Sequence, residues 1–439
     1  MDRIFCLPHQ LQAMTRFEAA LTAALEANGL ASPGAAQVLA SLEDAAFVDV
    51  PVLLEQSLLA SNLAIPFVRQ LTEAVRLRDP QAAASVHRGA TSQDVLDTAQ
   101  VLQLREALDP IRRDLDAIDS SLVTLARTHA GTLLAGRTWL QQGPPITLGL
   151  KVAGWIEALR RHRRRIDAAA AQALVLQFGG AVGTLSALGD RGLAVSAHLA
   201  RTLNLPEPRV PWHTHRDALV DLAAAFGLLV GTLGKIARDV SLLMQTEVGE
   251  VFEPVGEGRG GSSTMPHKRN PVASAVILAI ATRTPGLVAT LLTAMVQEHE
   301  RGLGGWQAEW ETIPEIVRLA AAALARTREI AAGLEVHPER MAANLDATHG
   351  LVMAEAVSVA LAEKLGRTQA HHLLEQASRR ALAEGRSLRE VLREIPEVGV
   401  HLSSADLDRL FDPRRNLGSA QAFLARVLGE VPGEPDGGS

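Results

Sequence analysis

The chain has 439 residues, of which 47% are hydrophobic, and a formal net charge of −6 at pH 7. This charge argues against a general nucleic-acid-binding protein, which would carry a basic face. A single cysteine excludes an internal disulfide and fits a reducing compartment. Because Met1 to Ile4 do not begin a long apolar signal region, we expect a cytoplasmic protein.

The spacing of apolar residues predicts helices along most of the chain. No stretch alternates as a strand would, so the expected fold is all-α. The predicted helices cover residues 9–30, 36–53, 91–108, 110–128, 146–174, 190–203, 219–243, 272–300 with a kink at Pro285, 313–334, 351–365, 368–383, 387–392, 404–411 and 417–428. Residues 429–439 are rich in Gly, Pro and Glu, and we expect them to be disordered.

The helix predicted at 219–243 has apolar residues that alternate by three and four, as in a helix packed against near-parallel partners. These residues are Leu222, Phe226, Leu229, Leu233, Ile236, Val240 and Leu243. The longest apolar stretches, 222–234 and 272–282, are shorter than the roughly 20 residues that span a bilayer. We therefore expect two buried helices and no membrane partner.

The predicted helices are long before about residue 349 and short after it, and this change indicates three helical domains. We expect an N-terminal domain at 1–109, a central long-helix bundle at 110–348 and a small C-terminal domain at 349–439.

Residues 261–271 read Gly-Ser-Ser-Thr-Met-Pro-His-Lys-Arg-Asn-Pro, which places two serine hydroxyls, an ammonium and an amide on one short loop. Pro271 suits the first turn of the apolar helix that follows. The loop thus ends at a helix N-terminus, where negative charge is favoured. These residues predict a site for an anion.

Two other patterns are weak. Residues 256–261 match GxGxxG, but a dinucleotide site requires a preceding strand, and the segment before this one is predicted to be helical. His371 and His372 are adjacent in a predicted helix and face different ways, so we expect no metal site there.

The loop at 261–271 resembles the GSSxMPxKxNP signature of the fumarase/aspartase superfamily, and residues 87–94 and 136–142 resemble its other signature regions. With 210–217 and 300–314, the similarity extends over most of the chain. The resemblance implies a twenty-helix core in a homotetramer, with each active site built from segments of three chains.

The resemblance also implies roles for individual residues. Ser262 corresponds to the catalytic serine, and Lys268 and Asn270 correspond to the groups that bind the carboxylate beside a developing carbanion. The residues expected to contact substrate are His87, Thr91, Ser92, Arg137, Trp139, Gln141, His213, Arg216 and Ser263. For His87, His213 and Ser263, structural hydrogen bonding is an open alternative.

Trp139 departs from the superfamily pattern. In the C–N lyases and hydratases that this chain resembles, Gly-Arg-Thr is followed by a histidine that helps to protonate the leaving group. An indole cannot transfer a proton at neutral pH. The loss fits a reaction in which the attacking or leaving group is a carboxylate, whose pKa of about 4 makes an acid unnecessary.

Trp139, Trp212 and the segment Gly305-Trp306-Gln307-Ala308-Glu309-Trp310 are similar to the 3-carboxy-cis,cis-muconate cycloisomerase branch of the superfamily. This resemblance implies that a small tricarboxylate diene closes to a lactone without a metal or an organic cofactor. Two alternatives remain open, a C–N lyase that releases fumarate and a non-catalytic homologue.

Overall fold

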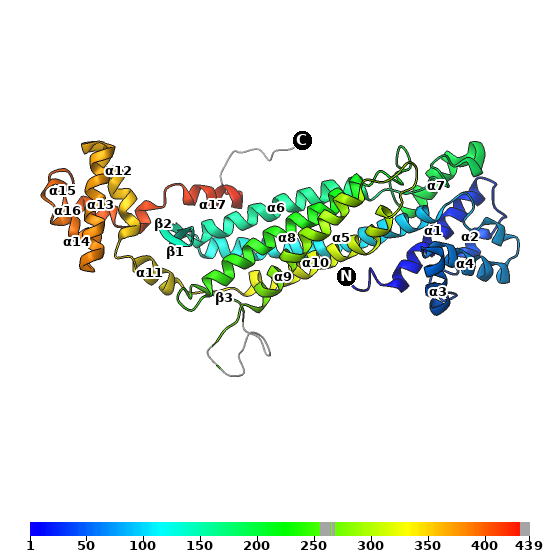
Figure 1. The fold of residues 1–439 in the computed structure, drawn as a ribbon, viewed down its shortest axis with the longest axis horizontal. Helices are drawn as coiled ribbons and strands as arrows, with labels where there is room; N and C mark the ends of the chain where they lie inside the picture. Colours follow the sequence, from blue (N-terminus) through cyan, green and yellow to red (C-terminus); the bar gives the residue numbers. More distant parts are fainter. Residues whose placement is uncertain (255–264, 266–267, 431–439) are drawn as a thin grey trace. The chain divides into compact units, whose positions relative to one another are not determined.

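The computed structural model describes residues 1–254, 265 and 268–430, and its main elements are helices (Figure 1). The α-helices are α1 (Leu7–Ala27), α2 (Ala35–Ala40), α3 (Val50–Ala60), α4 (Ala64–Arg78), α5 (Ser92–Thr128), α6 (Leu148–Ala173), α7 (Gly192–Leu203), α8 (Asp217–Leu243), α9 (Val272–Ala294), α10 (Gly305–Gly333), α11 (Pro338–Asp346), α12 (Ala354–Leu365), α13 (Arg367–Glu384), α14 (Leu388–Arg393), α15 (Pro396–His401), α16 (Ser404–Leu410) and α17 (Ala420–Leu428). Short 3-10 helices lie at Ala82–Ser85, Ser186–Arg191, Leu351–Met353 and Pro413–Asn416. The all-α prediction is confirmed.

The described residues also form two short antiparallel strand pairs that the sequence pattern did not indicate. β1 (Leu133–Thr138) and β2 (Gln141–Thr147) form an antiparallel hairpin, and β3 (Val251–Phe252) pairs with β4 (Glu335–Val336). The first hairpin carries the signature segment 136–142. The sequence does not indicate the turn, because the bulky residues Trp139 and Leu140 occupy the two turn positions where Asn-Gly is the usual signal.

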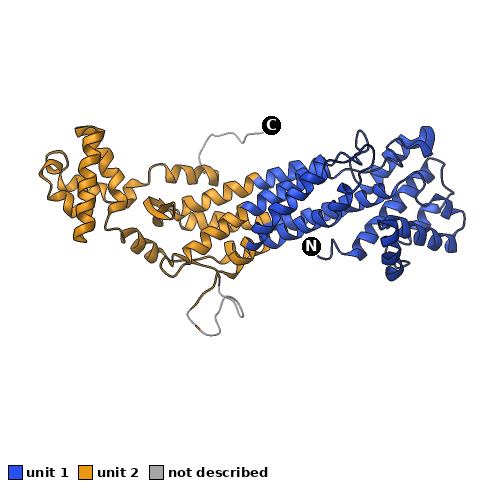
Figure 2. Cartoon of the chain, in the orientation of Figure 1, with its two compact units in different colours: residues 1–114, 162–231, 279–324 blue, residues 115–161, 232–278, 325–439 orange. Residues whose placement is uncertain are grey.

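The chain divides into two compact units (Figure 2). Unit 1 contains residues 1–114, 162–231 and 279–324, and unit 2 contains 115–161, 232–278 and 325–439. Helices α5, α6, α8, α9 and α10 each contribute residues to both units. Each unit consists of three separate segments, whereas the three domains expected from the sequence are continuous. The three-domain division stays a prediction.

In unit 1, helices α1, α2, α4 and α7 share a core that includes Phe17, Phe67 and Leu199. The predicted helix at 36–53 is wrong, because the chain forms two shorter helices there. The side chain of Asp49 accepts a hydrogen bond from the N–H of Val52 at 3.1 Å and so starts α3, with Pro51 in its first turn. The sequence prediction also missed α4.

Prolines inside the long helices do not end them. α5 continues through Pro110 and α10 through Pro314, although each proline removes a main-chain hydrogen bond. Ala107, Leu108 and Ile111, around the first proline, are almost fully buried. Packing of this kind offsets the roughly 3 kcal/mol that an interior proline costs, so the predicted break at residue 109 is wrong.

The apolar residues predicted along α8, from Leu222 to Leu243, are all buried, with at most 4% of any of them exposed. α8 and α9 are 27 and 23 residues long, so the prediction that their apolar runs are too short for a bilayer is wrong. By length and composition both helices could cross a membrane. Of the apolar 18-residue stretch that meets this criterion in each helix, 61% is buried in α8 and 22% in α9. The prediction of a buried helix thus fails for α9 within this chain.

Unit 2 contains a separate core among its C-terminal helices. Val357, Leu361, Ala370, Val391 and Val398 lie at its centre, contributed by α12 to α15. α16 begins with a capping box, in which Ser403 and Asp406 each accept a hydrogen bond from the main-chain N–H of the other.

Candidate active site

The residues predicted to form the active site fall into two groups, one in each unit. Unit 1 holds His87, Thr91, Ser92, His213 and Arg216, and unit 2 holds Arg137, Trp139, Gln141, Lys268 and Asn270. Ser262 and Ser263 lie outside the described residues.

In unit 1, Thr91 and Ser92 lie at the start of α5 and are partly buried. The Thr91 N–H donates to Asp94 Oδ2 at 3.0 Å, which holds the chain in place as the helix begins. Arg301 reaches both hydroxyls, since Nη1 donates to Thr91 Oγ1 at 2.7 Å and Nη2 to Ser92 Oγ at 3.4 Å. Its Nε donates to Gln93 Oε1 at 2.8 Å. Sequence reasoning missed Arg301, although it lies in the segment 300–314 that carries the resemblance.

His213 is buried against Asp94. Its Nε2 lies 2.7 Å from Asp94 Oδ1, and the two oxygens of Asp94 also accept the N–H groups of Gly179 and Gly180 at 3.1 and 2.9 Å. Gly180 has φ +70°, a conformation that favours glycine. His213 is only 4% exposed, so the geometry favours its structural hydrogen-bonding role over a substrate contact.

Arg216 lies between two carboxylates in the interior of unit 1. Its guanidinium donates to Asp97 at 2.7 and 3.1 Å and to Glu309 at 2.5 and 3.0 Å, and its side chain is fully buried. Burial raises the pKa of Glu309, although the charge of Arg216 opposes that shift. Trp306 Nε1 donates to Asp97 at 2.9 Å, so the tryptophan-rich segment holds this network together. A buried cation that is already paired twice favours a structural role for Arg216.

His87 is paired with Glu18, a fully buried carboxylate of α1. Its Nδ1 lies 2.6 Å from Glu18 Oε1, and its main-chain N–H donates to Oε2 at 2.9 Å. Burial alone would lower the pKa of His87, but the charge of Glu18 and this hydrogen bond outweigh it and raise the pKa. The pairing of Nδ1 leaves Nε2 as the atom that can meet a ligand.

In unit 2, Arg137 projects from the β1–β2 hairpin onto Glu250. Its Nη1 and Nη2 donate to the two oxygens of Glu250 at 2.9 and 2.6 Å, and Asn344 donates to the same carboxylate at 2.8 Å. Gly136 is required beside it, because a Cβ there would lie 2.7 Å from the carbonyl oxygen of Pro144. Since Glu250 is fully buried, Arg137 neutralises a charge of its own chain in this arrangement.

Trp139 and Leu140 form the tip of this hairpin, between the paired residues Thr138 and Gln141. Both have positive φ, +53° and +64°, which is unusual for bulky residues. They are 97% and 74% exposed, so neither side chain packs against the rest of its own chain. Two bulky side chains are thus exposed on a turn whose backbone conformation is strained.

Lys268 and Asn270 precede α9, and the Lys268 side chain is exposed. The N-terminus of α9 already binds an anion from the chain. Glu253, which is 6% exposed, accepts the N–H groups of Ala273 and Ser274 at 2.9 and 2.8 Å and the Ser274 hydroxyl at 2.6 Å. The expectation that this helix end receives the substrate anion is therefore wrong for these two N–H groups, because Glu253 occupies them.

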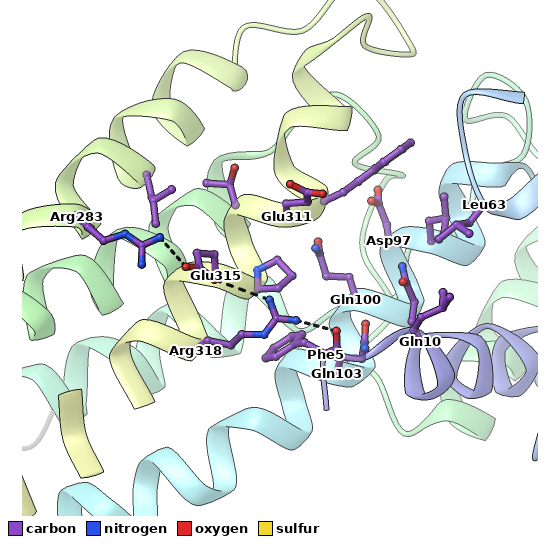
Figure 3. Close-up of a pocket in the computed structure, with 16 residues that line it drawn as sticks. Phe5, Gln10, Leu63, Asp97, Gln100, Gln103, Arg283, Glu311, Glu315 and Arg318 are labelled. Atoms are coloured by element: carbon purple, nitrogen blue, oxygen red, sulfur yellow. Dashed lines mark hydrogen bonds and ion pairs between the residues drawn. The ribbon is translucent and has the colours of Figure 1, made fainter. Parts of the chain in front are cut away.

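A cavity of about 620 Å³ in unit 1 is lined by none of the predicted residues (Figure 3). Its arginines are already engaged, as Arg283 pairs with Glu315 at 2.9 Å and Arg318 donates to the carbonyl of Phe5 at 2.8 Å. Glu311 adds a further negative charge to its wall. This lining disfavours a polycarboxylate, so we do not place the active site there.

These two groups of residues, on a fold dominated by long helices, define an enzyme of the all-helical lyase class. Residues 13–286 match the family described as Lyase, and residues 350–427 match the adenylosuccinate lyase C-terminus. The chain belongs to the fumarase/aspartase superfamily.

Three relatives illustrate its place in that superfamily. The chain is 53% identical over 430 residues to the 3-carboxy-cis,cis-muconate cycloisomerase of Pseudomonas aeruginosa, which covers 98% of this chain and 94% of that protein. It superimposes on the crystal structure of the 3-carboxy-cis,cis-muconate lactonizing enzyme from Pseudomonas putida with a TM-score of 0.92 and 51% identity, over 98% and 96% of the two chains. It is also 43% identical to a nitrosuccinate lyase of Streptomyces davaonensis, over 95% of this chain and 90% of that protein.

Proposed function

We propose that this chain is a cycloisomerase that converts 3-carboxy-cis,cis-muconate to 4-carboxymuconolactone in the β-ketoadipate pathway of protocatechuate degradation. The observation that carries the proposal is the 53% identity to a cycloisomerase across 98% of the chain. The tryptophan at 139 supports it, because ring closure by a carboxylate needs no acid at that position.

In this reaction a carboxylate oxygen of the substrate forms a bond to an alkene carbon of the same molecule. Because the two groups belong to one molecule, no entropy is lost in bringing reactants together. The π electrons move to the carbon beside another carboxylate, and a proton from the enzyme completes a C–H bond there. The substrate loses one carboxylate charge and gains one proton, so each turnover takes up a proton from the medium.

Roles follow from this chemistry. Lys268 and Asn270 stabilise the carboxylate next to the electron-rich carbon, and Ser262 delivers the proton to that carbon. His87, Thr91 and Ser92 in unit 1 hold other carboxylates. The proposed set of substrate-binding residues is completed by three residues of the hairpin, Arg137, Trp139 and Gln141, and by Ser263, His213 and Arg216. Because His213 and Arg216 are buried, the structure supports a substrate contact least for these two.

A C–N or other fumarate-type lyase is the second candidate, since a protein named nitrosuccinate lyase is 43% identical to this chain. The decisive assay mixes purified protein with 3-carboxy-cis,cis-muconate in chelator-treated buffer and follows the diene absorbance together with proton uptake. We expect one proton per molecule of diene lost, and Ser262→Ala is expected to abolish both signals. Release of ammonia or an amine from a succinyl compound, without lactonization, would reject the proposal.

We also propose that the chain works as a cytoplasmic homotetramer of three-domain subunits with active sites shared between copies. The exposed apolar residues of α9 support this assembly, because Val272, Val276 and Leu292 are 40%, 42% and 55% exposed. Analytical ultracentrifugation tests the mass of the assembly. Mixing two inactive variants, Thr91→Ala and Lys268→Ala, tests shared sites, since only sites built from different chains would regain activity in hybrids.

A further inference from the structure

Arg269 lies between Lys268 and Asn270, the two residues that stabilise the substrate carboxylate in the proposed function. The superfamily signature fixes the lysine and the asparagine but leaves the position between them variable. The Lys268 side chain is exposed, whereas the Arg269 side chain is 31% exposed and turned toward unit 2. The two adjacent cations therefore have different surroundings.

The Arg269 guanidinium binds two facing residues of the β3–β4 pair. Its Nη1 and Nη2 donate to the two oxygens of Glu335 at 2.7 and 2.8 Å, and its central carbon lies 4.5 Å from the centroid of the Phe252 ring. Phe252 and Glu335 are directly opposite each other in the strand register. A guanidinium that is bonded twice to one carboxylate and stacked on a ring has both its position and its orientation fixed.

A third contact joins Arg269 to the residue that caps α9. Its Nη2 also donates to the main-chain carbonyl of Glu253 at 2.8 Å. The carboxylate of the same Glu253 accepts the N–H groups of Ala273 and Ser274. One buried residue thus holds the chain on both sides of Asn270.

The ion pair of Arg269 with Glu335 is only partly buried, since the two side chains are 31% and 39% exposed. Pairs this exposed contribute little to the stability of a whole protein. Residues 268–270, however, form neither helix nor strand, so side-chain contacts have to fix their place. The pair is therefore expected to matter more for the placement of this segment than for global stability.

We propose that Arg269 is a positioning residue that holds Lys268 and Asn270 where they meet the substrate. It acts through Glu335 and does not itself bind substrate, because both of its terminal nitrogens are already engaged. The inference rests on the proposed function. In that function Lys268 and Asn270 stabilise charge that develops during the reaction, so a displaced segment should affect the transition state more than substrate binding.

The first test compares Arg269→Ala with Arg160→Ala as a matched control. Arg160 also lies in unit 2, where it donates to both oxygens of Asp119 at 2.7 and 3.0 Å and to the carbonyl of Val427 at 2.6 Å. Because a displacement of about 1 Å can slow catalysis about 100-fold, we expect kcat to fall roughly 10- to 100-fold in Arg269→Ala, with KM changed less than about threefold. Arg160→Ala should keep the wild-type values. Equal kcat in the two variants would overturn the inference.

A double-mutant cycle with Glu335 tests how Arg269 acts. If the two residues act through their ion pair, Glu335→Ala should lower kcat as Arg269→Ala does, and the double variant should lose no more than either single variant. Arg269→Lys keeps the charge without the paired hydrogen bonds and should recover part of the kcat. Additive losses in kcat, or a raised KM with unchanged kcat in Arg269→Ala alone, would indicate a direct substrate contact and overturn the inference.

Hydrogen exchange separates this inference from the proposed function, because it needs no substrate. We expect the hydrogen-bonded main-chain amides of residues 268–275 to exchange roughly tenfold faster in Arg269→Ala than in the wild type or in Arg160→Ala. Unchanged exchange would reject the positioning role even if the wild type lactonizes carboxymuconate. If exchange rises as expected but the wild type does not lactonize, the proposed function fails and the positioning role stands.

Discussion

His87 Nδ1 lies 2.6 Å from Oε1 of Glu18, and the other oxygen of this fully buried carboxylate accepts the main-chain N–H of the same histidine. One side chain of α1 thus fixes both the backbone and the ring of a residue that has a positive φ of +57°. The pair also makes the free energy of unfolding depend on pH.

Glu18→Gln should destabilise the protein in a pH-dependent way. The pKa of His87 is raised in the folded protein, so its contribution to stability is fully present below the unfolded value of about 6.5 and is lost as pH rises through the folded value. The glutamine keeps an acceptor but not the charge. We expect a loss of about 1.5–3 kcal/mol below about pH 6 that shrinks as the pH rises through the raised pKa of His87, measured by urea unfolding. A difference that stayed constant with pH would contradict this account.

Arg216→Met should destabilise unit 1 strongly. The substitution keeps an unbranched side chain but leaves Asp97 and Glu309 buried without their common cation. Breaking such a buried pair costs about 3–5 kcal/mol, which thermal unfolding would report. As a control, Arg76→Ala removes an exposed ion pair with Glu73 and is expected to leave the melting temperature unchanged. Equal effects of the two substitutions would show that burial of the pair is unimportant.

Trp139→Gly and Leu140→Gly both relieve the positive φ at the hairpin tip. Each should remove roughly 1 kcal/mol of backbone strain, because glycine adopts this conformation freely. We expect Leu140→Gly to keep most lactonization activity and Trp139→Gly to lose at least tenfold in kcat/KM, while circular dichroism shows the same helix content for both. Full activity of Trp139→Gly would remove Trp139 from the proposed site.

Glu253→Ala should affect both stability and activity. It removes the carboxylate that accepts the N–H groups of Ala273 and Ser274, at a cost of roughly 0.5–2 kcal/mol. The segment with Lys268 and Asn270 leads directly into this helix, so we also expect a lower kcat/KM. Asp49→Ala is the matched control, since it removes the carboxylate cap of α3, and it should lower stability alone. If both variants kept full activity, the cap of α9 would have no part in placing the two residues.

The helices and the superfamily could be predicted from the sequence because both signals are local. Apolar residues spaced by three and four define a helix wherever it packs, and the 261–271 loop is a contiguous pattern. The predicted break at residue 109 failed for a tertiary reason, since packing around Pro110 offsets the lost hydrogen bond. The first hairpin was missed because Trp139 and Leu140 occupy turn positions that their residue types do not favour.

The candidate site was predicted only in part. Its residue types follow from the signatures, but their partners do not. Arg137, Arg216 and Arg301 are all arginines in signature segments. In the structure, Arg137 pairs with Glu250, and Arg216 pairs with Asp97 and Glu309. Arg301 instead donates hydrogen bonds to neutral oxygens.

By itself, then, the sequence determined the helical periodicity, the reactive groups and the superfamily, because short-range spacing encodes each of them. The tertiary structure decided which charges neutralise each other and which donate to neutral oxygens instead. The Arg301–Thr91 contact joins residues 210 positions apart, and such a contact depends on how distant helices pack and on which carboxylates are already taken.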